Sequence, residues 1–227
     1  MCGRFTQTKK VEDYAEDVPD LRVEGSLVPS YNIAPTQTVA CIVGETSPIV
    51  VPLRWGLIPE WARDMTIGAR LINARAETIT QKPSFRESFK KRRCLVLADG
   101  FYEWQRPSGG ARKTPYYFRM QTGRGFAFAG LWASWRDPAG TTVETCTIIT
   151  TAANTLVQPV HHRMPVILPP AEYRQWLAVE SSDPNELLSA LAPYPANHME
   201  AYPVSEHVNH TKNNESTCIA PAPETML

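Results

Sequence analysis

The clearest pattern along the chain is a series of short runs rich in β-branched, aromatic and other apolar residues. Thr38–Val43 and Ile49–Trp55 are two such runs, and residues 44–48 between them contain a Gly and a Pro, which predicts a hairpin. Further strands are predicted at Cys94–Trp104, Pro115–Met120, Gly125–Trp135 and Thr142–Thr151, with a short one in the first six residues. Consecutive strands with short connections predict an antiparallel sheet that curls or closes.

Helical spacing is confined to short segments. Apolar residues recur every three to four positions over residues 11–18, behind Thr8 as a candidate N-cap. Ser84–Glu87 has the pattern of a capping box, and residues 170–179 and 185–191 also show helical spacing. We therefore predict an α+β fold: one domain with a curved, barrel-like antiparallel β core and short peripheral helices.

The chain shows no internal repeat and no linker between two cores, so residues 1–219 are expected to form one domain. Residues 220–227 are rich in Pro and lack periodicity, which predicts a loose tail. The 227 residues are 43% hydrophobic, enough to bury a core, and 20 Pro with 12 Gly argue against a helical bundle. We see neither an apolar run long enough to span a membrane nor a signal peptide, and expect a cytoplasmic protein associated with the nucleoid during DNA damage.

The net charge of zero conceals a segregation of charge along the chain. Residues 54–124 hold 15 Lys and Arg against 6 Asp and Glu, whereas residues 171–227 hold 2 against 8. A basic middle favours a polyanionic partner, because Lys and Arg that neutralise phosphates release counterions. A solvated positive face without a partner is the alternative.

Five cysteines are scattered along the chain without a CxxC pair or zinc-ligand spacing, so we expect no metal and no cofactor. Cys41, Cys94 and Cys146 lie in apolar runs and are predicted to be structural. Cys2 differs, because removal of Met1 would leave an amine and a thiol on adjacent carbons. This pair can condense with an aldehyde to a Schiff base and then a thiazolidine.

Three segments carry further candidate residues. Asn73, Arg75 and Glu77 alternate in an extended run and would share one face, although a lone Asn is more often a turn-capping residue. Glu103 ends an apolar strand, where desolvation would raise its pKa toward the range of a general acid or base. A solvent-facing or ion-paired Glu103 is the alternative.

The third segment is Pro159–Leu168, which places two histidines and an arginine before an apolar strand. Histidine can shuttle protons, and Arg163 has the planar fork that holds phosphate. If the segment is extended, His161 and His162 point to opposite sides, so at most one of them faces the cleft. Trp61, near the start of the basic segment, is a candidate exposed aromatic that could stack on bases.

Six ordered motifs together resemble the SOS-response-associated peptidase (SRAP) family. They are Met1–Phe5, Tyr31–Pro35, Arg54–Pro59, Asn73–Thr78, Gly100–Trp104 and His161–Leu168, and the similarity runs from Cys2 to about Ile219. The resemblance implies a protein that recognises abasic sites in single-stranded DNA and shields them with a covalent crosslink through its N-terminal cysteine.

The resemblance also implies roles for individual residues. Cys2 would be the nucleophile, Asn73 would orient the amine or sugar, Glu103 would move protons, and His161 would assist ring opening and reversal. Contacts to DNA would come from Arg4, Arg75, Arg163, Trp61 and Trp104. His162 departs from the family, in which an acidic or small polar residue is usual at this position, and the spacing to Pro165 favours His161 as the functional histidine.

Two other functions remain open on the sequence. One is an N-terminal-nucleophile thiol peptidase limited to self-processing, for which the sequence offers no identifiable oxyanion hole. The other is a non-catalytic single-stranded DNA-binding module, in which Cys2 is incidental. We expect a monomer whose partner is single-stranded DNA containing abasic sites, with no membrane association.

Overall fold

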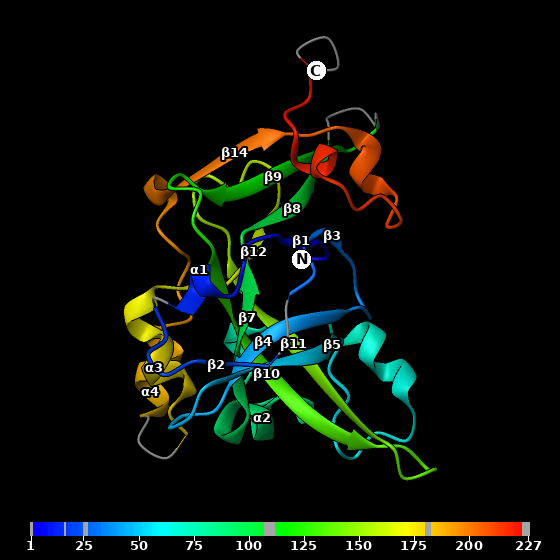
Figure 1. The fold of residues 1–227 in the computed structure, drawn as a ribbon, viewed down its shortest axis with the longest axis vertical. Coiled ribbons are helices and arrows are strands. Elements are labelled where there is room, and N and C mark those ends of the chain that lie inside the picture. The colour runs from blue at the N-terminus through cyan, green and yellow to red at the C-terminus, as the bar shows by residue number, and fades with distance from the viewer. Residues whose placement is uncertain (1, 16, 25–26, 107–111, 180–182, 224–227) are drawn as a thin grey trace.

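The computed structural model describes residues 2–15, 17–24, 27–106, 112–179 and 183–223. They form two β-sheets with short helices at the periphery (Figure 1). The predicted tail, residues 220–227, falls partly outside the described residues. Within the described ranges, no helix is both long and apolar enough to cross a bilayer.

The larger sheet closes on itself as a five-stranded barrel. Its antiparallel neighbours run in the order β11 (Thr142–Ala152), β10 (Phe126–Arg136), β7 (Arg93–Ala98), β4 (Thr38–Val43) and β5 (Ile49–Trp55). A parallel pairing of β5 with β11, in which Trp55 lies opposite Cys146, completes the ring. The curved, barrel-like core expected from the sequence is thus confirmed, with one parallel pair that the strand pattern did not reveal.

Short strands extend this barrel at its edges. β2 (Arg22–Val23) and β6 (Asn73–Arg75) pair in parallel with β5 and β11, respectively. β12 (Arg163–Pro165) and β13 (Ile167–Leu168) pair antiparallel with β11 and β10. β6 is the element that carries Asn73 to the rim of the barrel.

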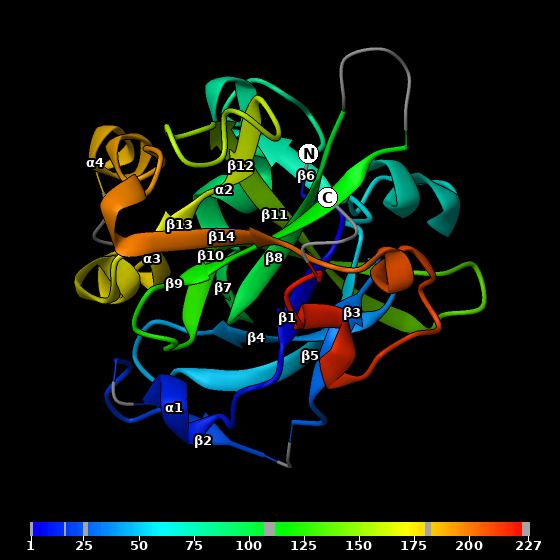
Figure 2. The ribbon, with the colours of Figure 1, turned by 90° about the horizontal axis from the view of Figure 1, so that it is seen from above.

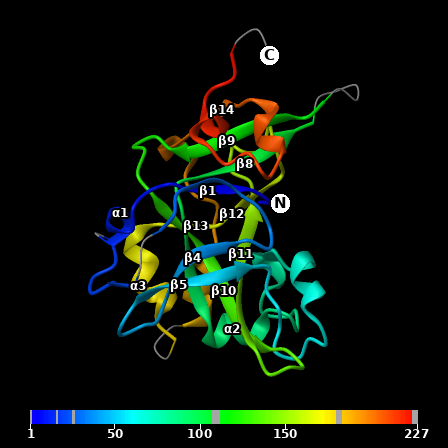
Figure 3. The same ribbon diagram turned by 45° about the vertical axis from the view of Figure 1, so that its right-hand side comes forward.

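The second sheet is antiparallel and lies across one end of the barrel, as Figures 2 and 3 show. Its order is β14 (Met199–Pro203), β9 (Thr114–Met120), β8 (Gly100–Gln105), β1 (Phe5–Gln7) and β3 (Ser30–Ile33). Pairing of Phe5 with Phe101 places the start of the chain beside the strand that carries Glu103.

The single strand predicted over Cys94–Trp104 is in fact two strands in different sheets. Asp99 separates β7 from β8, and its carboxylate accepts hydrogen bonds from the backbone N–H of Thr8 at 2.7 Å and from the hydroxyl of Thr6. At Gly100 a Cβ would lie 2.1 Å from the Tyr117 ring, so only glycine fits. The chain therefore leaves the barrel at Asp99 and enters the second sheet at Gly100.

The helices are short and peripheral, as expected. The α-helices are α1 (Glu12–Ala15), α2 (Arg86–Lys91), α3 (Tyr173–Leu177) and α4 (Pro184–Ser189). The 3-10 helices are η1 (Met65–Arg70), η2 (Ala76–Thr78), η3 (Pro170–Glu172), η4 (Ala196–His198), η5 (Glu206–Asn209) and η6 (Ser216–Ile219). The predicted capping box at Ser84 is wrong, because the N-cap of α2 is Phe85, without a side-chain cap.

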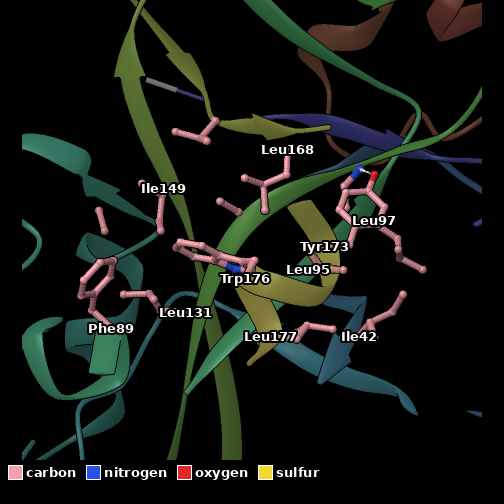
Figure 4. Close-up of a cluster of buried hydrophobic side chains, with 14 of the residues drawn as sticks. Ile42, Phe89, Leu95, Leu97, Leu131, Ile149, Leu168, Tyr173, Trp176 and Leu177 are labelled. Carbon is pink, nitrogen blue, oxygen red and sulfur yellow. Dashed lines mark hydrogen bonds between the residues drawn. The ribbon is translucent and has the colours of Figure 1, made fainter. Parts of the chain in front are cut away.

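Trp176 on α3 anchors this helix to the barrel. Its ring lies among apolar side chains of the barrel and of α2, including Phe89 at 6.2 Å between centroids (Figure 4). Its indole N–H donates to the carbonyl oxygen of Cys94 at 3.0 Å, which satisfies the buried polar atom. α2 and α3 thus cover the barrel, whereas η4, η5 and η6 pack against the second sheet, beside which the candidate site lies.

Candidate active site

The start of the chain is held against strand β6 by a side-chain hydrogen bond. The Asn73 side-chain amide donates to the carbonyl oxygen of Cys2 at 2.8 Å. Asn73 is fixed in turn by the parallel pairing of β6 with β11, in which it lies opposite Ile148. The remaining oxygen, Asn73 Oδ1, is buried and has no hydrogen-bond partner among the described residues. A buried acceptor of this kind favours a nearby donor.

The Cys2 side chain has no exposed surface in the chain that still carries Met1. Burial raises the pKa of the thiol well above its ordinary value, and the negative charge of Glu103 raises it further. In this state the thiol is protonated at neutral pH and shielded from solvent, so Cys2 is unreactive before processing.

Glu103 and His161 form the titratable centre of the site. Glu103 on β8 is 4% exposed, and burial raises the pKa of its carboxyl above the ordinary value, as the sequence predicted. His161 Nδ1 lies 3.9 Å from Glu103 Oε1. Burial lowers the pKa of His161, which favours the neutral ring near pH 7. The raised pKa of the carboxyl and the lowered pKa of the imidazole are closer to each other than the ordinary values are. Both groups can therefore exchange protons with a bound reactant.

The two histidines lie together, contrary to the expectation that they point to opposite sides. Their rings stack with centroids 4.4 Å apart and planes inclined by 29°. The segment is not extended here, because the backbone N–H of His161 donates to the carbonyl oxygen of Val157 in a turn. Both rings therefore reach the same cleft.

This cleft has a volume of about 480 Å³ and opens over Glu103. It is lined by Glu103, Trp104, Arg106, Lys113, Gln158, Pro159, Val160, His161 and His162. A second, shallower groove of about 520 Å³ is lined by Arg4, Trp104, Arg112, Lys113, Glu206 and Asn209. Trp104 and Lys113 belong to both, so the cleft and the groove are adjacent.

Arg4 and Trp104 form the boundary between the first strand and this groove. The Arg4 guanidinium lies 5.8 Å from the centre of the Trp104 ring and donates to Asn32 Oδ1 at 2.6 Å. The Trp104 indole N–H donates to Asn209 Oδ1 at 2.7 Å. Both predicted DNA contacts thus line a groove next to Glu103.

Arg163 is placed differently from the other predicted DNA contacts. It is 9% exposed, and its Nη2 donates to Glu77 Oε2 at 3.0 Å and to the carbonyl oxygen of Thr150 at 2.6 Å. This hydrogen-bonded pairing lowers the pKa of Glu77. The arrangement is that of a residue that fixes the loop carrying His161, and its position gives no support to a phosphate contact.

Asn73 and Arg75 alternate in β6 and share a face, as expected, but the expectation that Glu77 joins them is wrong. The strand ends at Arg75, which is exposed, and Glu77 lies in the 3-10 helix η2. Trp61 is 59% exposed, as an aromatic available for stacking would be, but lines neither the cleft nor the groove. Arg75 and Trp61 are thus solvent-accessible, whereas Asn73 is committed to Cys2.

Three cations that line these cavities were not singled out from the sequence: Arg106, Arg112 and Lys113. They flank the connection between β8 and β9, so a basic cluster at a hairpin tip was the available signal. The basic middle of the chain does not form one face, because α2 lies at the opposite end of the molecule from β9 (Figure 1). Arg93 is buried and donates to the carbonyl oxygen of Trp176.

A further cavity of about 570 Å³ lies near α3, away from these residues. Its lining includes Asp17, Asp20 and Glu45, opposed by Arg174. Negative charge of this density repels phosphates, so this cavity is unsuited to a nucleic acid.

One group of side chains in the described ranges has the composition of a metal site: His207, Glu215 and Cys218. The Asn213 side-chain amide lies 3.1 Å from His207 Nδ1 and donates to the carbonyl oxygen of His207 at 2.7 Å. Because the Asn213 amide donates, His207 Nδ1 is the acceptor. The ring proton is therefore on Nε2, which faces Glu215. The Cys218 thiol donates to the carbonyl oxygen of Asn213. These groups satisfy one another without an ion.

Comparison with known proteins finds relatives over nearly the whole chain. A family model described as SOS response associated peptidase (SRAP) matches residues 1–211. The abasic site processing protein YoqW of Bacillus subtilis is 46% identical over 222 residues, covering 96% of this chain and 99% of YoqW. The abasic site processing protein HMCES of Mus musculus is 30% identical over 243 residues, covering 90% of this chain and 68% of HMCES.

The fold is shared with solved structures. A crystal structure of a protein from Bacteroides thetaiotaomicron matches with a TM-score of 0.79 and 32% identity, covering 96% of this chain and 92% of that one. A protein from Bordetella bronchiseptica matches with a TM-score of 0.76 and 27% identity, covering 90% and 100%. With the family model matching residues 1–211 and homologues that process abasic sites, the chain belongs to the SOS response associated peptidase (SRAP) family.

Proposed function

We propose that this protein recognises abasic sites in single-stranded DNA and forms a covalent crosslink to them through Cys2, after Met1 has been removed. The proposal accords with the names of its homologues, which are abasic site processing proteins. The crosslink would shield the lesion during the response to DNA damage. The observation that carries the proposal is the hydrogen bond from Asn73 to the backbone of Cys2.

The chemistry requires an amine and a thiol on adjacent carbons. The ring-opened abasic sugar presents an aldehyde at C1′, and the Cys2 amine adds to it and releases one water to give a Schiff base. The thiol sulfur then bonds to the same carbon while its proton passes to the nitrogen, which closes a thiazolidine ring. One water is lost overall, and no oxidant or metal is needed.

Asn73 is suited to orient the reacting amine. Its Nδ2 already binds the Cys2 carbonyl, and its buried Oδ1 is an open acceptor beside the residue that would carry the amine. A hydrogen bond to Oδ1 would direct the nitrogen lone pair toward the aldehyde. Such positioning accelerates a reaction by holding the partners in the geometry of attack.

Glu103 and His161 are suited to move the protons. A carboxyl with a raised pKa can protonate the departing hydroxyl during Schiff-base formation and then accept the thiol proton. The negative charge of Glu103 raises the pKa of the Cys2 thiol, so the carboxylate favours a thiol that keeps its proton until the step that transfers it. His161 would assist the opening of the sugar ring and the reversal of the crosslink.

The cleft and the groove suggest the path of the strand. Arg106 and Lys113 supply positive charge at the cleft, and Arg4 and Arg112 supply it in the groove. The Trp104 ring between them offers a face on which a base can stack. Arg75 and Trp61 are exposed and available for more distant contacts, which we retain as part of the proposal.

Removal of Met1 is essential to this proposal. The Cys2 nitrogen is an amide while Met1 remains, and an amide cannot form a Schiff base. The thiol is also buried in that state, so processing must both free the amine and give the sugar access to Cys2.

The test is intact mass after incubation with a single-stranded oligonucleotide that carries one abasic site. The expected adduct has the mass of the chain without Met1 plus the oligonucleotide minus one water, and it survives denaturing electrophoresis. Intact DNA and a chain that retains Met1 serve as controls and give no adduct. Binding without any covalent product would instead identify a single-stranded DNA-binding module, and cleavage of peptides would identify a thiol peptidase.

A further inference from the structure

His162 is the titratable residue of the cleft to which the proposed reaction gives no role. Its ring is solvent-exposed on one side and covers His161 on the other, with 4.4 Å between ring centroids. Both rings line the cleft beside Glu103. His162 thus forms one wall of the space in which His161 would meet the sugar.

The backbone of Arg163 holds His161 in either protonation state. Its N–H lies 3.0 Å from His161 Nδ1, so Nδ1 of the neutral ring accepts and Nε2 carries the proton. The Arg163 carbonyl oxygen is also 3.0 Å from Nδ1 and can accept from the protonated ring. The edge of the ring is thereby fixed, and its face rests on His162.

Charged groups surround the pair on several elements. Those acting on it are Glu103 on β8, Arg106 and Lys113 at the hairpin, Arg75 on β6, Arg163 on β12, and the positive charge of the amino terminus of the chain, which lowers the pKa of both rings. The charge of His161 is the foremost cause that lowers the pKa of His162, with Arg163 and Arg75 adding to it. Protonation of His161 therefore makes protonation of His162 less favourable, and the pair resists taking up two protons.

We propose, on the basis of the function proposed above, that His162 is a positioning residue that braces the His161 ring and confines the pair to a single proton. Opening of the abasic sugar needs this behaviour. The C1′ hydroxyl loses a proton, the bond from C1′ to the ring oxygen breaks, and the ring oxygen gains a proton. A pair of rings that holds one proton and has one unprotonated nitrogen can accept the proton of the hydroxyl and donate the other proton to the ring oxygen. The pair then takes up no net proton.

Three substitutions at position 162 distinguish the steric support of the His161 ring from the electrostatic effect on that ring. His162→Phe keeps a flat ring against His161 and removes the titratable nitrogen. His162→Ala removes the brace, and His162→Asp places a negative charge beside His161. None of them alters a residue proposed to bond with the sugar, and the exposure of position 162 makes all three compatible with folding.

The first readout is the rate of crosslinking to abasic single-stranded DNA between pH 5 and 9. At pH 8, His162→Ala is expected to react about 5- to 10-fold more slowly than wild type, and His162→Phe within about 2-fold of it. His162→Asp is expected to shift the midpoint of the profile upward by roughly 0.5 to 1 pH unit, since a carboxylate favours the protonated ring. A His162→Asp profile that superposes on that of wild type, or an alanine variant as fast as wild type, overturns the proposal.

The second readout does not depend on crosslinking. Proton NMR of the free protein follows the titration of the His161 ring, which is expected to have a higher midpoint in His162→Asp than in His162→Phe. Equal midpoints in these variants overturn the coupling between the rings. Coupled titration in a wild-type protein that forms no crosslink would overturn the proposed function alone, so the two failures are distinguishable.

Discussion

Two regions of this molecule combine a cysteine, a glutamate and a histidine, and their environments differ. In the cleft, Glu103 is 4% exposed and burial raises the pKa of its carboxyl. In the loop that follows β14, the Glu215 side chain is 52% exposed, and its hydrogen bond with His207 lowers the pKa of the carboxyl. The pKa values of the two glutamates are thus shifted in opposite directions.

The two regions differ in how fully their polar side-chain atoms are hydrogen-bonded among the described residues. Around Cys218, the Asn213 amide, the His207 imidazole and the Glu215 carboxylate are hydrogen-bonded in series, and the thiol donates to the Asn213 backbone carbonyl, which holds a surface loop in place. Beside Cys2, the Asn73 oxygen is buried without a partner among the described residues. Incomplete satisfaction of buried polar groups destabilises a fold, and its presence at the chain start marks a place where a reactant can supply the missing partner.

The largest contrast is expected between the two cysteines. Cys2→Ala should abolish the covalent product with abasic single-stranded DNA while leaving noncovalent binding within about 2-fold, because alanine keeps the amine and loses the sulfur that closes the ring. Cys218→Ala should leave the yield of crosslink within about 2-fold of wild type. Denaturing electrophoresis measures the product, and fluorescence anisotropy with intact DNA measures binding. A stable crosslink formed by Cys2→Ala contradicts the assignment.

The two glutamates sharpen the comparison by rate. Glu103→Gln removes the titratable carboxyl and is expected to slow crosslinking by roughly 100-fold, the usual scale for loss of a general acid or base. Glu215→Gln should change the rate by less than about 2-fold. Quenched time courses at pH 7 give both numbers. Equal slowing in the two variants would show that Glu103 acts through the fold and not on the reactants.

The smallest expected effect is on thermal stability. A carboxyl whose pKa is raised in the folded state contributes to the free energy of unfolding below pH 4.5. This contribution is lost as the pH rises through the pKa of the folded state. At pH 7 the buried Glu103 carboxyl therefore opposes folding, and Glu103→Gln should raise the Tm by about 2–4 °C.

The opposite sign is expected at Glu215. The lowered pKa of Glu215 contributes stability that is present above pH 4.5 and is lost as the pH falls through the pKa of the folded state. Glu215→Gln should therefore lower the Tm at pH 7 by about 1 °C or less. The difference from wild type should shrink as the pH falls below 4.5. Calorimetry at pH 7 and below pH 4.5 measures these shifts, and a lower Tm for Glu103→Gln at pH 7 would be inconsistent with the burial of its charge.

Much of the fold was accessible from the pattern of residues. The predicted strands Thr38–Val43 and Ile49–Trp55 coincide with β4 and β5, because their alternation and the turn between them are local properties. The break at Asp99 was not accessible in this way. It depends on the hydroxyl of Thr6 and the ring of Tyr117, which reach Asp99 and Gly100 from distant parts of the chain.

The candidate site was predicted in part for the same reason. The burial of Glu103 follows from the apolar strand around it, so its raised pKa could be anticipated. The sequence could not show that Arg93, one of the basic residues of the middle segment, and Arg163, a candidate phosphate contact, are turned inward, because their partners, Trp176 and Glu77, are far from them in sequence. The stacking of the two histidines depends on a local turn closed by Val157, which the expectation of an extended segment overlooked.

The parallel alignment of β6 with β11 has a consequence for the newly made chain. Asn73 takes its place only when the partner segment around Ile148 exists, so the contact that holds Cys2 cannot form while the first half is emerging from the ribosome. At roughly 5–20 residues per second, about 8 to 30 s pass before that segment is made. The amino terminus is available to a cotranslational aminopeptidase during this interval, before the finished core encloses the sulfur.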